Sequence, residues 1–293
     1  MATEARLNLL APGHRACPGC GAAIALRLIL RPLGKETIVV SATGCVETFT
    51  SPYGQSAWDV PWMHSLFENS AAIATGVQAA LEALGEQANL VVISGDGGTF
   101  DIGFGALSGM FERKDNITYI CYDNEAYMNT GVQRSGSTPH AAVTTTTPSG
   151  SHSYGKLEYK KDMPAIAMAH DAEYVATTSI AYPQDLMRKV KKANEIYGPK
   201  YIQVHTPCCI GWGFDPSETI ELGRLAVETC LVPIFEKEKG KPMVVKKIAN
   251  KKPITDYLKK QNRFKHLFKE EERDAVIKEL QQICDDNARR FGI

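Results

Sequence analysis

Two short polar segments of this chain carry residue types that can bind a divalent cation. One is the Gly-Asp-Gly triplet at 95–97, and the other is Asp-Asn-Glu-Ala-Tyr-Met-Asn at 123–129. Each follows an apolar run, and the stretch between them is long enough for one helix. Because consecutive parallel strands end at the same edge of a sheet, where ligands bind, we expect Asp96 to meet the turn 124–126.

The oxygen atoms expected at that edge suit magnesium. They are the carboxylate of Asp96, the side-chain amide oxygen of Asn124 and the backbone carbonyl of Ala126. Mg²⁺ prefers such oxygen ligands and commonly binds phosphates as well. Gly97 and Gly98 open the following helix, whose free N–H groups can bind a phosphate. The segment therefore predicts a magnesium site that holds a diphosphate, although Asp96 could also serve as the N-cap of that helix.

Four of the eight cysteines lie in three separate places along the chain. Cys17 and Cys20 form a Cys-x-x-Cys hairpin, whereas Cys45 and Cys208 each follow an expected strand. Four cysteines can bind a [4Fe–4S] cluster. Zinc is the alternative, but its four-cysteine sites usually contain two paired motifs. One pair with two scattered residues favours the cluster, with Cys209 as a second candidate for the place of Cys208.

Alternating strands and helices must position these residues. The expected strands cover 37–41, 90–94, 117–122, 174–178 and 201–205, and the expected helices cover 21–33, 64–84, 101–112, 163–170 and 183–197. This alternation predicts an α/β fold with a doubly wound, mostly parallel sheet. The stretch 128–162 reads as a loop, and we expect it to be functional because it follows the proposed metal turn.

The chain divides into two expected regions. Residues 1–235 should form the ligand-binding domain, with the cysteine hairpin at its N-terminal end. Residues 236–293 are charged and strand-poor. We interpret them as a C-terminal extension that folds over a neighbouring subunit and ends in a helix near 271–290.

Composition narrows the class of protein. The 33 basic and 33 acidic residues leave no net charge, so no general field attracts nucleic acid. No apolar run reaches the roughly 18 residues of a membrane span, and residues 1–6 lack a signal-peptide pattern. These features predict a cytoplasmic protein whose thiols stay reduced. The remaining Cys121, Cys230 and Cys284 are expected to be buried.

The two polar segments resemble a known family when they are compared in full. They read Gly-Asp-Gly-Gly-Thr-Phe-Asp-Ile-Gly-Phe-Gly at 95–105 and Asp-Asn-Glu-Ala-Tyr-Met-Asn-Thr-Gly at 123–131. Their spacing resembles the thiamine diphosphate fingerprint. Their residues are more similar to those of the thiamine-binding β subunits of the 2-oxoacid:ferredoxin oxidoreductases, most of all the β subunits of enzymes that use pyruvate. The similarity covers most of residues 10–235, and its motifs are jointly specific.

The resemblance implies a set of cofactors and ligands. The cofactors are thiamine diphosphate, Mg²⁺ and one [4Fe–4S] cluster bound by Cys17, Cys20, Cys45 and Cys208. Pro207 and the following Gly-Trp pair favour Cys208 over Cys209 in this match. Asn129 matches a catalytic residue that positions and stabilises the reacting groups. The positions implied to contact the cofactors are Gly95, Asp96, Gly97, Gly98, Asn124, Ala126, Asn129, Cys45, Glu68 and Asn69.

The resemblance also implies a reaction and partners. The reaction is the reversible, coenzyme A-dependent oxidative decarboxylation of pyruvate to acetyl-CoA and CO₂, with electrons passed to ferredoxin. An α-type subunit would supply the pyrimidine-binding domain and its activating acid. Subunits of γ and δ type would complete the enzyme, the δ type with ferredoxin-like clusters. The small-residue helix expected at 64–84 is our candidate for part of the interface with the α-type subunit.

Other functions remain open from the sequence. The oxoacid could be 2-oxoglutarate, a branched-chain or aryl 2-oxoacid, or oxalate, although the segment 211–216 looks most like the pyruvate class. A second possibility is a thiamine enzyme without electron transfer, such as an acetolactate-synthase-like decarboxylase or a transketolase, but the four cysteines argue against it. A third is a zinc-stabilised interaction module with a chance Gly-Asp-Gly.

Overall fold

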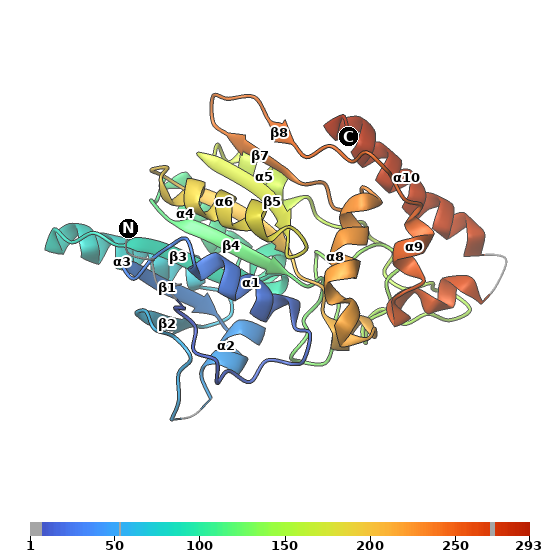
Figure 1. Cartoon of the computed structure of the whole chain (residues 1–293), viewed down its shortest axis with the longest axis horizontal. Helices are drawn as coiled ribbons and strands as arrows, with labels where there is room; N and C mark the ends of the chain where they lie inside the picture. The colour runs from blue at the N-terminus through green and yellow to red at the C-terminus, as the bar shows by residue number, and fades with distance from the viewer. Residues whose placement is uncertain (1–7, 53, 270–272) are drawn as a thin grey trace, which may run out of the picture.

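Eight strands form one sheet in the part of the chain that the computed structural model describes, residues 8–52, 54–269 and 273–293 (Figure 1). The strand order is β2-β1-β3-β4-β6-β5-β7-β8. The strands are β1 (Thr37–Ala42), β2 (Trp62–Ser65), β3 (Asn89–Gly95), β4 (Thr118–Asp123), β5 (Tyr174–Ser179), β6 (Lys200–His205), β7 (Phe235–Glu238) and β8 (Val244–Val245). The six strands from β2 to β5 in this order pair in parallel, and β7 and β8 are antiparallel. The expected doubly wound, mostly parallel α/β sheet is confirmed.

Helices cover both faces of the sheet. They are α1 (Gly21–Leu30), α2 (Cys45–Thr50), α3 (Ser70–Leu84), α4 (Phe104–Glu112), α5 (Met163–Ala169), α6 (Pro183–Asn194), α7 (Cys209–Trp212), α8 (Thr219–Glu228), α9 (Ile254–Leu258) and α10 (Asp274–Phe291). Apolar residues of α1 and α6 pack on one face, and those of α3, α4 and α5 pack on the other. Successive strand residues therefore enter different cores, as Val39 and Val40 of β1 do.

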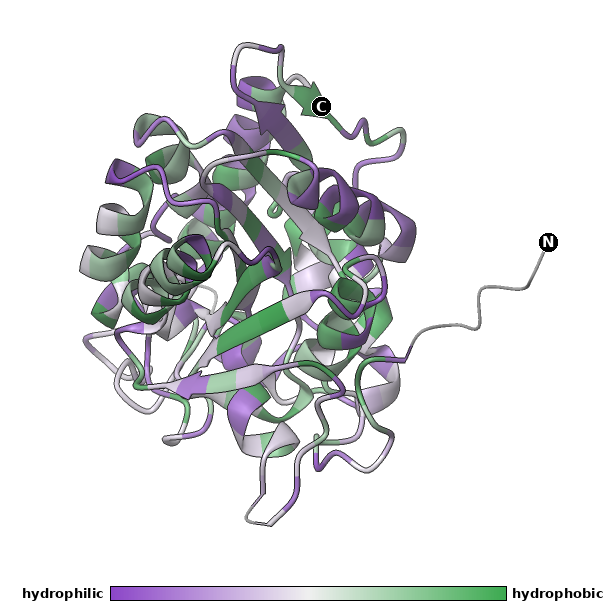
Figure 2. Ribbon diagram, turned by 90° about the vertical axis from the view of Figure 1, so that its left-hand side faces the viewer, coloured by the Kyte–Doolittle hydropathy of each residue, from purple (hydrophilic) through white to green (hydrophobic). Residues whose placement is uncertain are grey.

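Helices cover both faces of the central strands, so these strands are buried on both sides. Every residue of β4 is buried, and so is every residue of β5. Figure 2 shows the hydrophobic colour along strands in the middle of the sheet, whereas the helices carry both colours. This buried frame fixes the carboxyl ends of β3 and β4 side by side, with Gly95 paired to Tyr122.

We expected a helix over 64–84, and its predicted start is wrong. The helix begins at Ser70, and residues 62–65 form β2. This short edge strand pairs with β1. The expected helix 101–112 is also modified. Residues Gly97–Ile102 form a π-helix, and α4 begins only at Phe104. Such wide turns occur frequently at functional sites.

The C-terminal region adds to this chain's own fold. The expected boundary after residue 235 falls inside β7, which extends the sheet, so this region contains strands that we did not predict. Figure 1 shows α8, α9 and α10 together at the opposite side of the molecule from α3. Their shared core includes Trp212, Tyr257, Leu258, Phe264, Leu267, Leu280 and Cys284. A contact between this region and another subunit stays a prediction.

The loop expected at 128–162 contains no helix and no strand, and all of its residues are described. It folds back over the sheet edge through isolated bridges such as Tyr127 to Gln133. In the described ranges, no helix is both long and apolar enough to cross a membrane. The expectation about a signal peptide concerns residues 1–6, which lie outside the described residues.

Candidate active site

Three oxygen atoms of the expected magnesium ligands converge at the carboxyl ends of β3 and β4. The side-chain oxygen of Asn124 lies 2.9 Å from Oδ1 of Asp96 and 3.0 Å from the backbone oxygen of Ala126. A carboxylate and a carbonyl are both acceptors, so this arrangement is unfavourable unless a cation lies between the oxygens. Rotating the amide by half a turn would instead point Nδ2 at both acceptors. With a cation bound we favour the converging oxygens, since they form the ligand set of Mg²⁺.

Asp96 is held for this role by a neighbour in the loop. It occupies the N-cap position of the π-helix, but its side chain makes no capping hydrogen bond. Oδ2 accepts a hydrogen bond of 2.5 Å from the hydroxyl of Ser135, which leaves Oδ1 facing Asn124. Asp96 is 1% exposed. Burial, with the carboxylate of Asp123 second, raises its pKa well above the ordinary value. A bound cation would reverse that shift.

A cavity of about 190 Å³ adjoins these oxygens. Its lining includes Gly95, Asp96, Gly97, Tyr122, Asn124, Ala126, Tyr127 and Asn129. Gly97 is needed for the approach of the aromatic wall, because a Cβ there would lie 2.5 Å from the ring of Tyr127. Ten residues were expected to contact the cofactors. When Glu68 and Asn69 are set aside, seven of the other eight line this cavity.

Three expected contacts do not reach it. Gly98 is packed against β3, where a Cβ would lie 2.6 Å from the hydroxyl of Ser94. Glu68 is exposed, and Asn69 lies at the start of α3 with its buried Oδ1 unpartnered. Phe67, one residue earlier, lines the cavity in their place. β2 occupies residues 62–65, so the chain enters α3 differently from the expected uninterrupted helix. Cofactor contacts by Gly98, Glu68 and Asn69 stay predictions.

A second cavity of about 170 Å³ gathers the expected cluster ligands. Cys17, Cys20, Cys45, Cys208 and Cys209 all line it, and all five are free thiols. In the described part of the chain, no three His, Cys, Asp or Glu side chains meet closely enough to hold a single metal ion. The cysteines therefore line a cavity and do not converge on the position of a single metal ion.

The surroundings distinguish Cys208 from Cys209. Burial raises the pKa of Cys45, and the next contributions come from Cys208, Cys20, Asp96 and Cys17. Cys209 instead donates its S–H to the carbonyl of Pro18 at 3.1 Å and is 3% exposed. Cys208 therefore acts on Cys45, whereas Cys209, which lines the same cavity and acts on Cys20, has its sulfur directed at Pro18.

Backbone N–H groups point at two of these sulfurs. Sγ of Cys208 accepts from the N–H of Gly211 at 3.4 Å. Sγ of Cys20 interacts with the N–H groups of Ala22 and Ala23 at the start of α1. Burial still raises the pKa of Cys208 to about 11, with further contributions from Cys20 and Cys209. Such N–H groups stabilise metal-bound thiolates.

The two cavities share a wall. Cys45, Thr48, Asn124, Met128 and Asn129 line both of them. Oδ1 of Asn129 accepts from Sγ of Cys45 at 3.1 Å, and its Nδ2 donates to Thr48 at 2.9 Å. Nδ2 of Asn124 donates to the same sulfur of Cys45 at 3.9 Å. A group bound in either cavity would thus be separated from the other by one layer of side chains.

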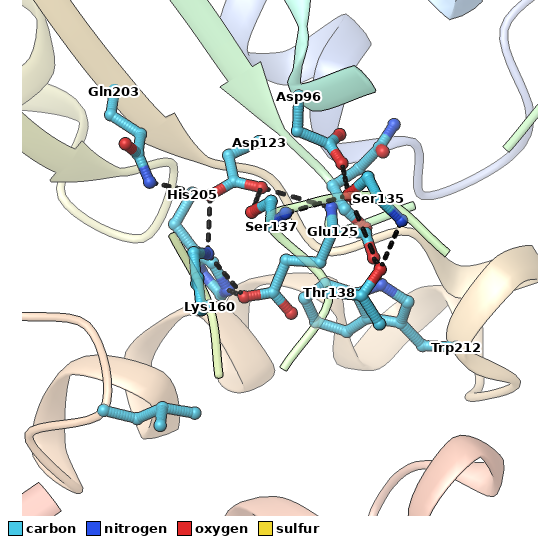
Figure 3. A network of polar contacts seen from close by, with 12 residues as sticks. Asp96, Asp123, Glu125, Ser135, Ser137, Thr138, Lys160, Gln203, His205 and Trp212 are labelled. Atoms are coloured by element: carbon cyan, nitrogen blue, oxygen red, sulfur yellow. Dashed lines mark hydrogen bonds and ion pairs between the residues drawn. The ribbon is translucent and has the colours of Figure 1, made fainter. Parts of the chain in front are cut away.

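A buried charged network supports the turn at residues 123–126, and sequence reasoning missed it (Figure 3). Lys160 donates to Asp123 at 2.6 Å and to Glu125 at 3.0 Å. Arg263 donates to the other oxygen of Glu125 at 2.7 Å. Burial alone would raise the pKa of Glu125, but Lys160 and Arg263 lower it to about 2. Both cations thus stabilise a turn in which Glu125 has a left-handed φ of 68°, uncommon for a residue with a side chain.

The loop and β6 contribute further contacts to this network. Ser137 donates to Asp123 at 2.5 Å, and Thr138 donates to the carbonyl of Glu125 at 2.6 Å. Gln203 of β6 donates to the other oxygen of Asp123 at 2.7 Å. The only sequence signal for these partners is the length of the loop and its Ser-rich start.

Comparisons with known proteins agree with this geometry. A family model described as "Thiamine pyrophosphate enzyme, C-terminal TPP binding domain" matches residues 42–204. The chain is 53% identical over 295 residues to pyruvate synthase subunit PorB of Methanosarcina barkeri, with 100% of both chains covered. It is 54% identical over 281 residues to the subunit of that name from Methanothermobacter marburgensis, which covers 95% of this chain and 97% of the relative.

A solved structure shares the fold. The 2-oxoglutarate:ferredoxin oxidoreductase from Magnetococcus marinus, with 2-oxoglutarate, coenzyme A and succinyl-CoA bound, matches with a TM-score of 0.58 and 27% identity. The match covers 73% of this chain and 77% of that one. The chain therefore belongs to the thiamine pyrophosphate enzymes, and among them to the 2-oxoacid:ferredoxin oxidoreductases, as a thiamine diphosphate-binding β subunit that resembles pyruvate synthase subunit PorB.

Proposed function

We propose that this chain binds Mg²⁺–thiamine diphosphate in the Asp96 cavity and one [4Fe–4S] cluster in the cysteine cavity. Together they would serve the coenzyme A-dependent oxidative decarboxylation of pyruvate to acetyl-CoA and CO₂, which is reversible and passes electrons to ferredoxin. The observation that carries this proposal is the wall shared by the two cavities, with Cys45, Asn124 and Asn129 on it.

The chain's oxygen ligands would hold the cation. Asp96, Asn124 and Ala126 present three converging oxygens, and Ser135 keeps the carboxylate of Asp96 in place. Thiamine diphosphate, when bound, supplies the electron sink that decarboxylation of a 2-oxoacid requires. Asn129 lies on the wall next to Cys45, where its amide can position the reacting groups and stabilise their charge.

The cysteine cavity would hold the electron acceptor. Cys17, Cys20, Cys45 and Cys208 supply four thiolates, the number that a [4Fe–4S] cluster binds. The N–H groups directed at Cys20 and Cys208 offset the negative charge of the thiolates. Oxidation of a 2-oxoacid releases two electrons, and a cluster accepts them singly. A cluster behind Cys45 would be one side-chain layer from their source.

We propose that other subunits complete the enzyme. An α-type subunit would bring the pyrimidine-binding domain and its activating acid. Subunits or domains of γ and δ type would complete the enzyme, the δ type with ferredoxin-like clusters. The α3 helix supports such assembly, because only Ser70, Ala71 and Ala74 of its residues are buried, while Leu84 is 75% exposed. The C-terminal region 236–293 is a second candidate contact. We place the assembly in the cytoplasm, in keeping with its free cysteines.

A substrate screen of the assembled enzyme tests this function. The enzyme is purified anaerobically from its source, and ferredoxin reduction with coenzyme A is measured for pyruvate, 2-oxoglutarate, branched-chain and aryl 2-oxoacids, and oxalate. Pyruvate should give the highest kcat/KM. A different preferred oxoacid would keep the chemistry and correct the substrate. Release of CO₂ without any electron acceptor would instead favour a decarboxylase that lacks electron transfer.

A further inference from the structure

The side chain of Asn124 contacts both cavities through different atoms. Its oxygen lies 2.9 Å from Oδ1 of Asp96 and 3.0 Å from the carbonyl of Ala126. Its nitrogen lies 3.9 Å from Sγ of Cys45 and is oriented to donate. One planar amide therefore spans the distance from the proposed cation ligands to a proposed cluster ligand.

The amide has two possible orientations with opposite consequences for Cys45. With the oxygen toward Asp96, three oxygens converge and the nitrogen donates to the sulfur. After half a turn, Nδ2 donates to Asp96 and Ala126, and the oxygen faces the sulfur instead. The first orientation requires a cation among the oxygens, and the second satisfies the acceptors without one. Occupancy of the cation site thus decides which atom points at Cys45.

We propose that the Asn124 amide is a positioning group that couples the two cavities, so that binding of Mg²⁺–thiamine diphosphate places its N–H on the sulfur of Cys45. This inference rests on the proposed function, because it needs both the cation and the cluster. A hydrogen bond to a ligating sulfur stabilises the reduced, more negative form of a cluster and raises its reduction potential. The cluster would become a better electron acceptor when the thiamine site is filled.

Potentiometric titration of the assembled enzyme, followed by the EPR signal of the reduced cluster, tests this coupling. Titrations are run with and without Mg²⁺ and thiamine diphosphate. At one fixed solution potential, addition of Mg²⁺ and thiamine diphosphate should raise the ratio of reduced to oxidised cluster roughly threefold. This is the effect expected of one weak hydrogen bond. For a one-electron couple, in which tenfold is 59 mV, that is about 28 mV.

Two variants isolate the amide. Asn124→Asp keeps an oxygen ligand for the cation but has no N–H, so the cofactor-dependent shift should vanish. Asn129→Asp is the matched control: it adds the same charge beside Cys45, whose sulfur lies 3.1 Å from Asn129, without altering the cation ligands. The reduction potential of the cluster should fall in Asn129→Asp, but the change in that potential on addition of the cofactor should remain. An undiminished shift in Asn124→Asp would overturn the coupling.

Two further readouts keep the result interpretable. Calorimetry confirms cofactor binding, and iron analysis confirms the cluster; if either is absent in the native enzyme, the proposed function fails. If both are present without a shift, only the coupling fails. Should Asn124→Asp not bind the cofactor, deuteron ENDOR of the native cluster in D₂O decides. A deuteron coupled to the cluster should appear when the cofactor is added, and an unchanged spectrum would contradict the proposal.

Discussion

The ammonium group of Lys160 lies 2.6 Å from Oδ2 of Asp123, although 37 residues separate them. Asp123 ends β4, next to the proposed cation ligand Asn124, and its side chain is 1% exposed. Lys160 lies near the end of the long loop, so this ion pair fastens the loop to the sheet edge beside the proposed cation ligands. The predictions below follow from this network and from the two cavities.

Lys160→Met should destabilise the protein by about 3–5 kcal/mol, because it leaves a buried carboxylate without its cation. The free energy of unfolding, from urea denaturation, measures the loss. Lys160→Arg is the control, since it keeps the charge and should lose much less. A loss below about 1 kcal/mol for the Met variant would mean that Asp123 and Glu125 are satisfied without Lys160.

Asp96→Ala should abolish Mg²⁺-dependent binding of thiamine diphosphate to the assembled enzyme. A methyl group supplies no oxygen for the cation that anchors a diphosphate. Isothermal titration calorimetry measures the binding, and circular dichroism confirms that the fold is retained. Unchanged affinity would remove Asp96 from the ligand set.

Asp96 should also impose a pH dependence on the metal-free chain. Its pKa is raised in the folded state, so its protonated form is favoured there, and its contribution to stability is full below about pH 4 and is lost as the pH rises. Asp96→Asn lacks this titration. The melting temperature of the Asn variant relative to the parent chain should therefore increase between pH 4 and pH 7. Saturating Mg²⁺ should shrink the difference, and a constant difference would contradict the burial argument.

Single replacements by Ser at Cys17, Cys20, Cys45 or Cys208 should lower iron from roughly four atoms per chain to less than one, because each removes a cluster ligand. Cys209→Ser and Cys284→Ser are matched controls and should retain iron, since Cys209 is directed at Pro18 and Cys284 is buried in the C-terminal core. Iron and sulfide are measured after anaerobic reconstitution. Loss of iron from Cys209→Ser but not from Cys208→Ser would exchange the two assignments.

The isolated chain, reconstituted with iron, sulfide, Mg²⁺ and thiamine diphosphate, should be catalytically silent. The activating acid is expected on an α-type subunit, and such a group contributes roughly 10²–10⁴-fold to rate. Pyruvate-dependent CO₂ release and ferredoxin reduction are measured before and after addition of the partner subunits. Comparable turnover by the chain alone would show that it carries the whole site.

Sequence reasoning succeeded where local pattern and topology coincide. The convergence of Asp96 with Asn124 and Ala126 was predictable because each follows a buried strand and those strands are neighbours in the sheet. The scattered cysteines were predictable as a group for the same reason, since Cys45 and Cys208 follow β1 and β6.

The rest depended on tertiary contacts without a local signal. Ser135 and Lys160 lie in an irregular loop, whose path is set by the buried carboxylates that it meets. β7 carries the charged sequence Phe-Glu-Lys-Glu, yet it pairs with β5, where Tyr174 donates to Glu236 at 2.6 Å. The strand β2 has only four residues, too few for a pattern, and its formation displaced Glu68 from the expected position.

The ion pair between Arg263 and Glu125 determines when the site can be finished during synthesis. The two residues are 138 positions apart, and Glu125 stands between the proposed ligands Asn124 and Ala126. A ribosome delivers the chain from its N-terminus, so the turn waits for Arg263 until almost the whole polypeptide has emerged. Until then Glu125 lacks one of its two cationic partners, so the turn that carries the proposed ligands is completed only near the end of translation.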